Sequence, residues 1–251
     1  MSGKLRGKVA LVTGGGVRVG KAIALALGEA GADVAIHYGS SRGQAEETAR
    51  SIAATGVRSA PVQADLAVPE DIYSLFDEVE KSFGGLDVLV NSAAVFEKTP
   101  FENLDLEKWD RVMKINLTAP FLCCRRAAPL MKARGGGNII NICDIGGMAA
   151  WKGFSHYNVS KAGLIMLTKS LAVELAPEIS VNAVAPGTVL FPDDYDEKER
   201  KRIESRIPMG HAGSPQDVAG AVMFFVAGSG YVTGQVLAVD GGRSAHDITG
   251  G

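Results

Sequence analysis

Residues 9–20 read VALVTGGGVRVG, a short apolar run that leads directly into a cluster of glycines. Glycines let the backbone turn sharply and approach a ligand closely, and a helix that starts just after them presents free N–H groups at its positive end. Residues 19–30 then have the spacing of an amphipathic helix. This order predicts a phosphate-binding turn of a dinucleotide site, with Gly14 and Val19 against the cofactor. The alternative is a glycine-rich turn that holds no ligand.

The rest of the chain repeats the alternation of a short apolar run and a longer amphipathic segment. The runs are rich in Val and Ile, as strands buried on both faces should be, and they predict strands at 9–13, 34–37, 59–63, 88–91, 138–143, 181–185 and 235–239. The segments between them predict helices at about 19–30, 44–55, 69–83, 106–134, 155–175 and 215–226. We therefore expect an α/β fold: one Rossmann-type domain over residues 1–251, with about seven strands in a doubly wound parallel sheet and helices on both faces.

Composition and charge narrow the class of protein. The chain has 251 residues, of which 46% are hydrophobic, and its formal net charge is −2, with no basic stripe. Nucleic acid and anionic membranes are therefore poor candidate partners. The three cysteines, Cys123, Cys124 and Cys143, form no CxxC motif, so neither a disulfide framework nor a zinc site is supported. With no apolar run long enough for a signal peptide or a membrane span, we expect a cytoplasmic protein that needs no metal.

One long stretch, residues 187–213, has no strand pattern. It carries a proline, a cluster of acids and a charged helical piece that ends near Arg206. A stretch of this length without a strand is typical of a segment that covers a site, so we expect a substrate flap at 187–213. The alternative is a solvated surface helix.

The residues after the second predicted strand indicate which dinucleotide binds. Proteins that bind NAD usually place an acid there to accept hydrogen bonds from the ribose hydroxyls. This chain has no acid there and instead offers two hydroxyls and a guanidinium, which suit a 2′-phosphate. We therefore expect NADP(H) rather than NAD(H), bound in part by His37, Tyr38, Ser40, Ser41 and Arg42. For Arg42 the alternative is a solvated loop charge.

A candidate catalytic set follows the fifth predicted strand. Asp144 stands at its end, Tyr157 follows 13 residues later, and Lys161 follows after four more. A tyrosine and a lysine at this last spacing share one helix face, where the ammonium is expected to lower the pKa of the phenol. Tyr157 is therefore a plausible general acid for a reduction near neutral pH.

Together these motifs resemble the short-chain dehydrogenase/reductase family over nearly the whole chain. The resemblance rests on Thr13-Gly14 with Gly20 (TGxxxGxG), Asp65-Leu66, Asn91-Ser92-Ala93-Ala94, Asn116, Tyr157-x-x-x-Lys161, Asn182-Ala-Val-Ala-Pro186-Gly187 and Val239-Asp240-Gly241-Gly242. It implies that Asn116 holds a water linked to the catalytic lysine. It also implies cofactor contacts from Asp65, Leu66, Asn91, Ala93, Lys161, Pro186 and Gly187.

Two residues depart from the usual family pattern. Arg18 replaces the middle glycine of the turn, and Asp144 replaces the usual catalytic serine. A carboxylate would repel a developing alkoxide, so it suits a substrate with N–H donors better than an ordinary ketone. Both departures resemble the pteridine reductase subgroup. That resemblance implies that Phe96 stacks a pterin against the nicotinamide, that Arg18 lies near both the phosphates and the pterin, and that Asp144 and Tyr157 also contact the substrate.

The expected activity is therefore NADPH-dependent hydride transfer to a pterin-like ring. Tyr157 would deliver the proton to nitrogen, with Asp144 beside it and Lys161 assisting. One alternative is a carbonyl reductase of the 3-oxoacyl type, and a second is an NADP-binding regulator without catalysis. The family resemblance further implies a homotetramer, formed through the helices at 106–134 and 155–175 and through the last strand region.

Overall fold

The chain is built around a sheet of seven parallel strands in the computed structural model, which describes residues 3–191 and 195–245. The strands are β1 (Val9–Thr13), β2 (Asp33–Tyr38), β3 (Ser59–Gln63), β4 (Val88–Asn91), β5 (Gly137–Ile142), β6 (Ile179–Pro186) and β7 (Val236–Val239). Their spatial order is β3-β2-β1-β4-β5-β6-β7, so the order of winding reverses between β1 and β4. In doubly wound sheets, ligands bind outside the carboxyl ends of the strands at this reversal.

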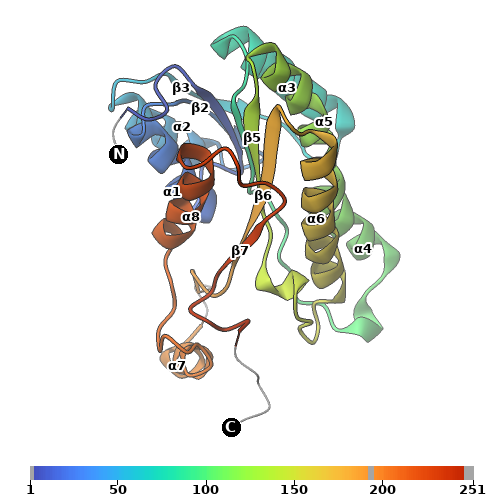
Figure 1. Cartoon of the computed structure of the whole chain (residues 1–251). Helices are drawn as coiled ribbons and strands as arrows, with labels where there is room; N and C mark the ends of the chain where they lie inside the picture. The colour runs from blue at the N-terminus through green and yellow to red at the C-terminus, as the bar shows by residue number, and fades with distance from the viewer. Residues whose placement is uncertain (1–2, 192–194, 246–251) are drawn as a thin grey trace.

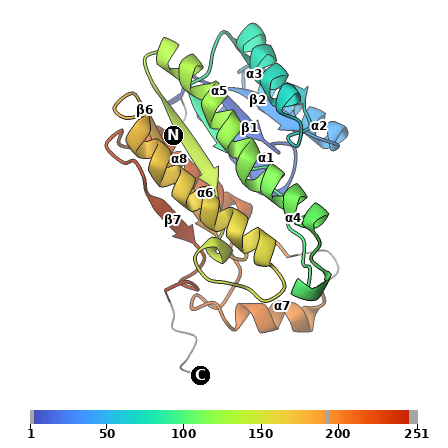
Figure 2. The same cartoon turned by 90° about the vertical axis from the view of Figure 1, so that its right-hand side faces the viewer.

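Helices cover both faces of the sheet (Figures 1 and 2). One face carries α1 (Arg18–Glu29), α2 (Arg42–Ala53) and α8 (Pro215–Ala227). The other carries α3 (Pro69–Phe83), α4 (Leu106–Met113), α5 (Ala119–Ala133) and α6 (Ser155–Glu174). The short α7 (Glu197–Glu204) lies apart from both layers, at the lower end of the molecule in Figure 1. Within the described residues, no helix is both long and apolar enough to cross a membrane.

Alternate residues of each central strand supply two separate cores, one on each face of the sheet. All five residues of β1 are buried. Val12 packs with Ile23 and Leu27 of α1, whereas its neighbour Leu11 packs with Phe76 of α3 on the opposite face. This two-residue period explains why the strands read as continuous apolar runs. The structure confirms the expected fold class.

The predicted helix at 106–134 is wrong in one respect. It is divided into α4 and α5 by a π-helical turn, η2 (Lys114–Thr118). Pro120, near the start of α5, lacks the N–H that would reach back to the Asn116 carbonyl in a continuous α-helix. A single wide turn accommodates this missing bond, and such turns occur often at functional sites.

Candidate active site

Loops at the carboxyl ends of β1, β4 and β5 meet at the point where the winding reverses. Thr13 joins two of them, because its hydroxyl accepts hydrogen bonds from the backbone N–H groups of Ser92 (2.9 Å) and Ala93 (3.1 Å). Two short 3₁₀ turns, η1 (Phe101–Asn103) and η3 (Ile145–Gly147), follow β4 and β5 at the same end of the sheet. The predicted site residues therefore converge on one edge of the sheet.

The glycine turn leaves room for a ligand and for nothing larger than hydrogen at its own side-chain positions. A methyl group at Gly20 would lie 2.2 Å from the Gly14 carbonyl oxygen, and one at Gly14 would lie 3.1 Å from the Ala93 Cα. No side chain caps α1 at Val17, so the N–H groups of its first turn face the open end. This cradle fits a pyrophosphate.

Arg18 begins α1 with a φ of 51°, in the left-handed region that favours glycine. Its side chain is exposed beside the turn, so its charge can reach a bound phosphate. A glycine adopts this conformation without a steric penalty, so the turn has a backbone that suits the residue Arg18 replaces. Val19 follows it in the first turn of α1, as the cofactor prediction requires.

His37 contacts the glycine turn through its imidazole ring. Its imidazole is buried, and Nδ1 accepts a hydrogen bond from the Gly14 N–H (3.1 Å) while Nε2 faces the Ala64 carbonyl at 3.0 Å. Burial lowers the pKa of His37, so the neutral ring is the form that makes these bonds. Tyr38 is also buried. The His37 side chain therefore positions the turn, and a direct cofactor contact from His37 or Tyr38 stays a prediction.

The residues expected at a 2′-phosphate lie together at the start of α2. Ser40 is exposed, Ser41 caps the helix, and the Arg42 guanidinium projects into solvent, where it pairs with Glu46 (2.8 Å). An exposed pair on one helix turn is weak and exchanges readily for a phosphate partner. The structure thus leaves this group free to act as predicted.

Two residues expected at the adenine end have different surroundings. Asp65 is exposed after β3, and its carboxylate accepts a hydrogen bond from the Ala67 N–H (2.9 Å). Leu66 is buried in the core beside α3. The exposed carboxylate is accessible to a ligand, whereas the Leu66 side chain is not.

The Asn91 side chain points into the core, away from the site. Its side-chain N–H group donates to Asn141 (2.9 Å) and to Cys124 (3.4 Å) inside the core. The Asn91 side chain therefore links β4 to β5, and only its backbone lies at the edge of the site. A cofactor contact from the Asn91 backbone therefore stays a prediction.

Pro186 and Gly187 stand where the sequence predicts the nicotinamide end. Pro186 closes β6, and the Gly187 N–H donates to the Val239 carbonyl (2.9 Å). A methyl group at Gly187 would lie 2.7 Å from the Asp240 Cβ, which explains the glycine. The two residues lie at the carboxyl end of β6, next to the end of β7.

The three residues of the predicted catalytic set lie close together. The Tyr157 hydroxyl donates to Oδ2 of Asp144 (2.9 Å), whose Oδ1 accepts from the Gly146 N–H (2.7 Å). The Lys161 ammonium is buried below them and donates to the Ile142 carbonyl (2.8 Å), 5.7 Å from the centroid of the Tyr157 ring. One face of α6 thus presents both Tyr157 and Lys161 to the end of β5.

The pKa of Tyr157 is shifted in the direction opposite to the one that the sequence predicts. The pKa of Tyr157 is raised well above its usual value by burial and then by the charge and hydrogen bond of Asp144. The sequence predicts that Lys161 lowers this pKa, and the structure does not show such a lowering. Burial also raises the pKa of Asp144 and lowers that of Lys161. Tyr157 is therefore a firmly protonated phenol, the form that a proton donor needs.

Asn116 joins the π turn to the loop that follows β4. Its side chain accepts from the Val95 N–H (2.8 Å), donates to the Val95 carbonyl (2.9 Å) and approaches the Ser160 hydroxyl at 3.2 Å. This clamp fixes the residue next to Phe96 against α6. Asn116 therefore has a positioning role that can be read directly from its contacts.

A wall of aromatic side chains borders Tyr157. Phe96 is 55% exposed, its ring stacks on Phe154 at 4.8 Å, and it meets the edge of Tyr157 at 4.8 Å. Trp151 packs edge-on against Phe154 at 6.1 Å. The sequence predicts the role of Phe96 but misses Phe154, whose only signal is its place three residues before Tyr157. The wall can hold a flat or apolar substrate part.

The described residues around the site offer no group of metal ligands. Among residues 3–191 and 195–245, no three His, Cys, Asp or Glu side chains are placed to hold a metal ion.

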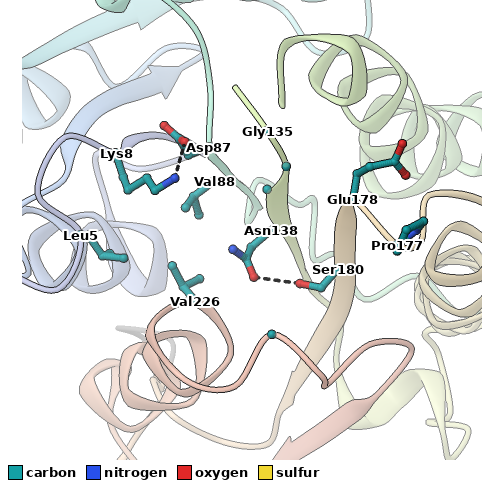
Figure 3. Close-up of a pocket in the computed structure, with 13 residues that line it drawn as sticks. Leu5, Lys8, Asp87, Val88, Gly135, Asn138, Pro177, Glu178, Ser180 and Val226 are labelled. Atoms are coloured by element: carbon teal, nitrogen blue, oxygen red, sulfur yellow. Dashed lines mark hydrogen bonds and ion pairs between the residues drawn. The ribbon is translucent and has the colours of Figure 1, made fainter. Parts of the chain in front are cut away.

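A cavity of about 300 Å³ lies at the opposite end of the sheet, bordered by Asp87, Asn138 and Glu178 (Figure 3). Its Asp87 carboxylate is already paired with Lys8 at 2.9 Å, and none of its residues belongs to the predicted site.

Comparison with known proteins agrees with this geometry. A family model described as enoyl-(acyl carrier protein) reductase matches residues 16–244. The chain is 40% identical to 3beta-hydroxysteroid dehydrogenase 1 of Eggerthella lenta, over 96% of this chain and 95% of that protein. It is 38% identical to the 3-oxoacyl-(acyl-carrier-protein) reductase of Staphylococcus aureus strain Mu50, over 94% and 97% of the two chains.

A solved structure shows the same fold with a ligand. The short chain dehydrogenase of Burkholderia cenocepacia, solved in complex with NADP, has a TM-score of 0.89 and 36% identity, covering 96% of this chain and 99% of that one. The names of the Eggerthella and Staphylococcus relatives refer to a hydroxysteroid and to a 3-oxoacyl group, and neither name refers to a pterin. With the fold, the glycine cradle and the Tyr157/Lys161 pair in place, these matches show that the chain belongs to the short-chain dehydrogenase/reductase family.

Proposed function

We propose that the protein is an NADP(H)-dependent reductase that reduces a carbonyl group at Tyr157. The observation that carries this proposal is the hydrogen bond from the Tyr157 hydroxyl to Asp144, at the end of the sheet that also carries the glycine cradle. The two curated relatives, which match over nearly their full length, carry steroid and 3-oxoacyl names, and both names describe carbonyl or hydroxyl chemistry. The solved relative that holds NADP and the exposed Arg42 guanidinium, which is paired with Glu46, support the choice of cofactor.

Tyr157, Asp144 and Lys161 have separate roles in this reaction. Bound NADPH would supply the hydride. Tyr157 donates a proton to the oxygen that receives charge, and its raised pKa keeps it in the donating form. Burial raises the pKa of Asp144, and in its protonated form this side chain can donate a second hydrogen bond to the same oxygen. The buried Lys161 ammonium lies on the other side of the ring and stabilises negative charge that develops on Tyr157.

A second candidate is reduction of a pterin-like heterocycle. It is favoured by Asp144 itself, because an ionised carboxylate at that position accepts N–H groups and disfavours an alkoxide. The exposed Phe96 ring, which offers a flat surface next to Tyr157, supports the same candidate. The two candidates require opposite ionisation states of Asp144, so they can be separated.

The test is oxidation of NADPH at 340 nm by the purified protein. The substrates are an acetoacetyl thioester, a 3-ketosteroid and dihydrobiopterin, each measured also with NADH. Turnover of the carbonyl compounds with NADPH supports the first candidate, and turnover confined to dihydrobiopterin transfers support to the second. Tyr157→Phe should lose turnover of every substrate. Tight NADPH binding with no turnover of any of them would instead indicate an NADP-binding regulator.

We also propose that residues 187–213 close over the substrate. The described part of this stretch includes α7, which lies at the end of the molecule where α6 begins (Figures 1 and 2), while residues 192–194 fall outside the described residues. The acidic Asp196 caps α7 by accepting from the Glu199 N–H (2.8 Å), which stabilises the helix. A helix at this end of the sheet can move as a unit over the cleft.

We further propose that the protein forms a homotetramer in the cytoplasm. Val159, Met166 and Val173 are exposed at seven-residue intervals along one side of α6, and Phe224 and Leu237 are exposed on α8 and β7. Two separate apolar faces fit two kinds of twofold contact, as a tetramer with dihedral symmetry requires. The free, buried cysteines are compatible with a reducing compartment.

A further inference from the structure

Arg243, which follows β7, extends across the carboxyl end of the sheet. Its Nη1 donates to the Thr188 hydroxyl in the loop after β6 (3.1 Å). Its guanidinium carbon lies 5.7 Å from the centroid of the Trp151 ring, in the loop after β5. One side chain therefore joins three loops that border the catalytic cleft.

The same guanidinium lies next to the catalytic set. A methyl group at Gly146 would lie 3.1 Å from Oδ1 of Asp144 and 3.4 Å from Cε3 of Trp151, so these two side chains flank one point. Trp151 continues through Phe154 into the aromatic wall. The positive charge of Arg243 also acts on Asp144, where it opposes the rise in pKa that burial causes.

The guanidinium keeps hydrogen-bond donors for a ligand. It has five N–H donors, and the described residues give it a single side-chain hydrogen bond, to Thr188, and no ion pair with an acid. The nearby Asp240 carboxylate is occupied by the backbone N–H groups of Gly242 (2.9 Å) and Ser244 (2.6 Å). Arg243 is only partly buried, so a ligand in the cleft can reach it.

We propose that Arg243 is a specificity-determining residue that binds a carboxylate on the substrate. The substrate class is a flat ketone that carries an acidic group: its ring lies against Phe96, its carbonyl lies at Tyr157, and its carboxylate is bound at the Trp151 end of the wall. A planar guanidinium pairs with a carboxylate through two parallel hydrogen bonds, which fixes the orientation of the ring. This inference rests on the proposed carbonyl reduction.

The first test compares 4-acetylbenzoate with its methyl ester as substrates in the presence of NADPH. Losing charge-assisted hydrogen bonds of this kind changes affinity by about tenfold to a hundredfold. For the wild type we expect a KM for the acid lower than that for the ester by about this factor. Arg243→Met should remove the difference by raising KM for the acid alone, with kcat largely unchanged, and Arg243→Lys should restore part of it. Arg50→Met, at an exposed position in the last turn of α2, is the matched control.

The second test measures binding without turnover. The chain has two tryptophans, so in a Trp109→Phe background the fluorescence reports on Trp151 beside Arg243. Titration with 4-acetylbenzoate should change this fluorescence at lower concentrations than the ester, and Arg243→Met should abolish the preference.

The two tests separate this inference from the proposed function. Acid-selective binding that Arg243→Met removes, without reduction of any ketone, would support the anion site and count against carbonyl reduction. Reduction of acid and ester with equal KM, or an acid preference that survives in Arg243→Met, would overturn the inference and leave the proposed function standing. Failure of the acid to bind at all would also overturn it.

Discussion

At the scale of single residues, Asp144 decides which reaction the site favours. It occupies the end of β5, accepts from the Tyr157 hydroxyl and is buried enough to raise its pKa. As a neutral acid it offers a second donor to a carbonyl oxygen, and as a carboxylate it offers an acceptor to a ring N–H. The ionisation of one side chain therefore distinguishes the two candidate functions.

This predicts the sign of a pH profile. If carbonyl reduction is the activity, kcat/KM for a ketone falls as pH rises through the raised pKa of Asp144, because the donating acid is lost. Asp144→Ser keeps a donor at every pH, so this limb should vanish while activity at higher pH increases. For a pterin the profile inverts: activity falls as the carboxylate becomes protonated, and Asp144→Ser is slower throughout. A ketone profile unchanged by Asp144→Ser would contradict the role given to Asp144.

His37 gives a second prediction at this scale, on stability. Burial holds its folded-state pKa below the unfolded value of about 6.5, so the unfolded chain takes up the proton first as pH falls. Its contribution is complete above that pH and is lost as pH falls toward the folded pKa. When the pH is lowered from 7.5 to 5.5, the Tm of the wild type should therefore fall more than that of His37→Gln. Thermal melting at each pH measures the two changes.

The control for this experiment lies in the same chain. His156 is also buried with a lowered pKa, but it is present in both proteins, so the difference between the two melting curves isolates His37. Equal pH dependence in the two proteins would show that His37 does not hold the turn through its neutral ring. NADPH affinity measured at the same pH values should weaken in parallel, because the Gly14 N–H loses its acceptor.

Individual residue roles were harder to predict from sequence than their positions. The sequence places Asp144, Tyr157 and Lys161 together because one helix period and one strand end determine their geometry. It does not show that the Asn91 side chain turns into the core toward Asn141, since an asparagine at a strand end looks the same in either orientation. Phe154 was missed because an isolated loop aromatic carries no periodic signal.

At the scale of elements, buried strands were the most predictable part of the fold. The buried strands β1 and β4 have the predicted bounds, because each is a short apolar run that begins directly after a charged residue. The break between α4 and α5 was not predicted, because both segments continue the same apolar period. Only Pro120 marks it, and a proline near a helix start is usually tolerated.

The junction of the glycine turn and α1 gives a prediction at this scale. In Gly20→Ala the added methyl would lie 2.2 Å from the Gly14 carbonyl oxygen, so the backbone of the turn must shift. We expect a loss of about 1–3 kcal/mol in the free energy of unfolding and a loss of NADPH binding. Urea denaturation and a cofactor titration by fluorescence measure the two effects.

The matched control is Gly43→Ala in α2. A methyl there meets nothing within 4 Å, and a helical glycine replaced by alanine should stabilise the protein by about 1 kcal/mol. Opposite shifts in the two variants would show that contact with the turn, rather than loss of a flexible residue, is responsible. A Gly20→Ala protein that binds NADPH as the wild type does would refute the close-packed cradle.

At the scale of the whole molecule, the sheet that builds the site also leaves two apolar faces open. One is the side of α6 that carries Val159, Met166 and Val173, where Val173 is 81% exposed. The other lies around β7, the last strand in the sheet order, whose outer edge has no neighbouring strand among the described residues. Open strand edges and apolar helix stripes are the surfaces that associate in water.

The final prediction follows from having two such faces instead of one. Val173→Glu places a charge at the most exposed residue of the α6 stripe and should convert a tetramer into a dimer that persists through β7 and α8. Adding Leu237→Glu to Val173→Glu should give a monomer, because it places a charge on the second face. Size-exclusion chromatography with light scattering measures each mass, and circular dichroism checks that the fold is retained. Val68→Glu, at a position 38% exposed next to α3 and away from both faces, should stay tetrameric. A wild-type monomer, or a tetramer unaffected by Val173→Glu, would mean that the α6 stripe faces solvent, and the catalytic cleft would then have to be complete within a single chain.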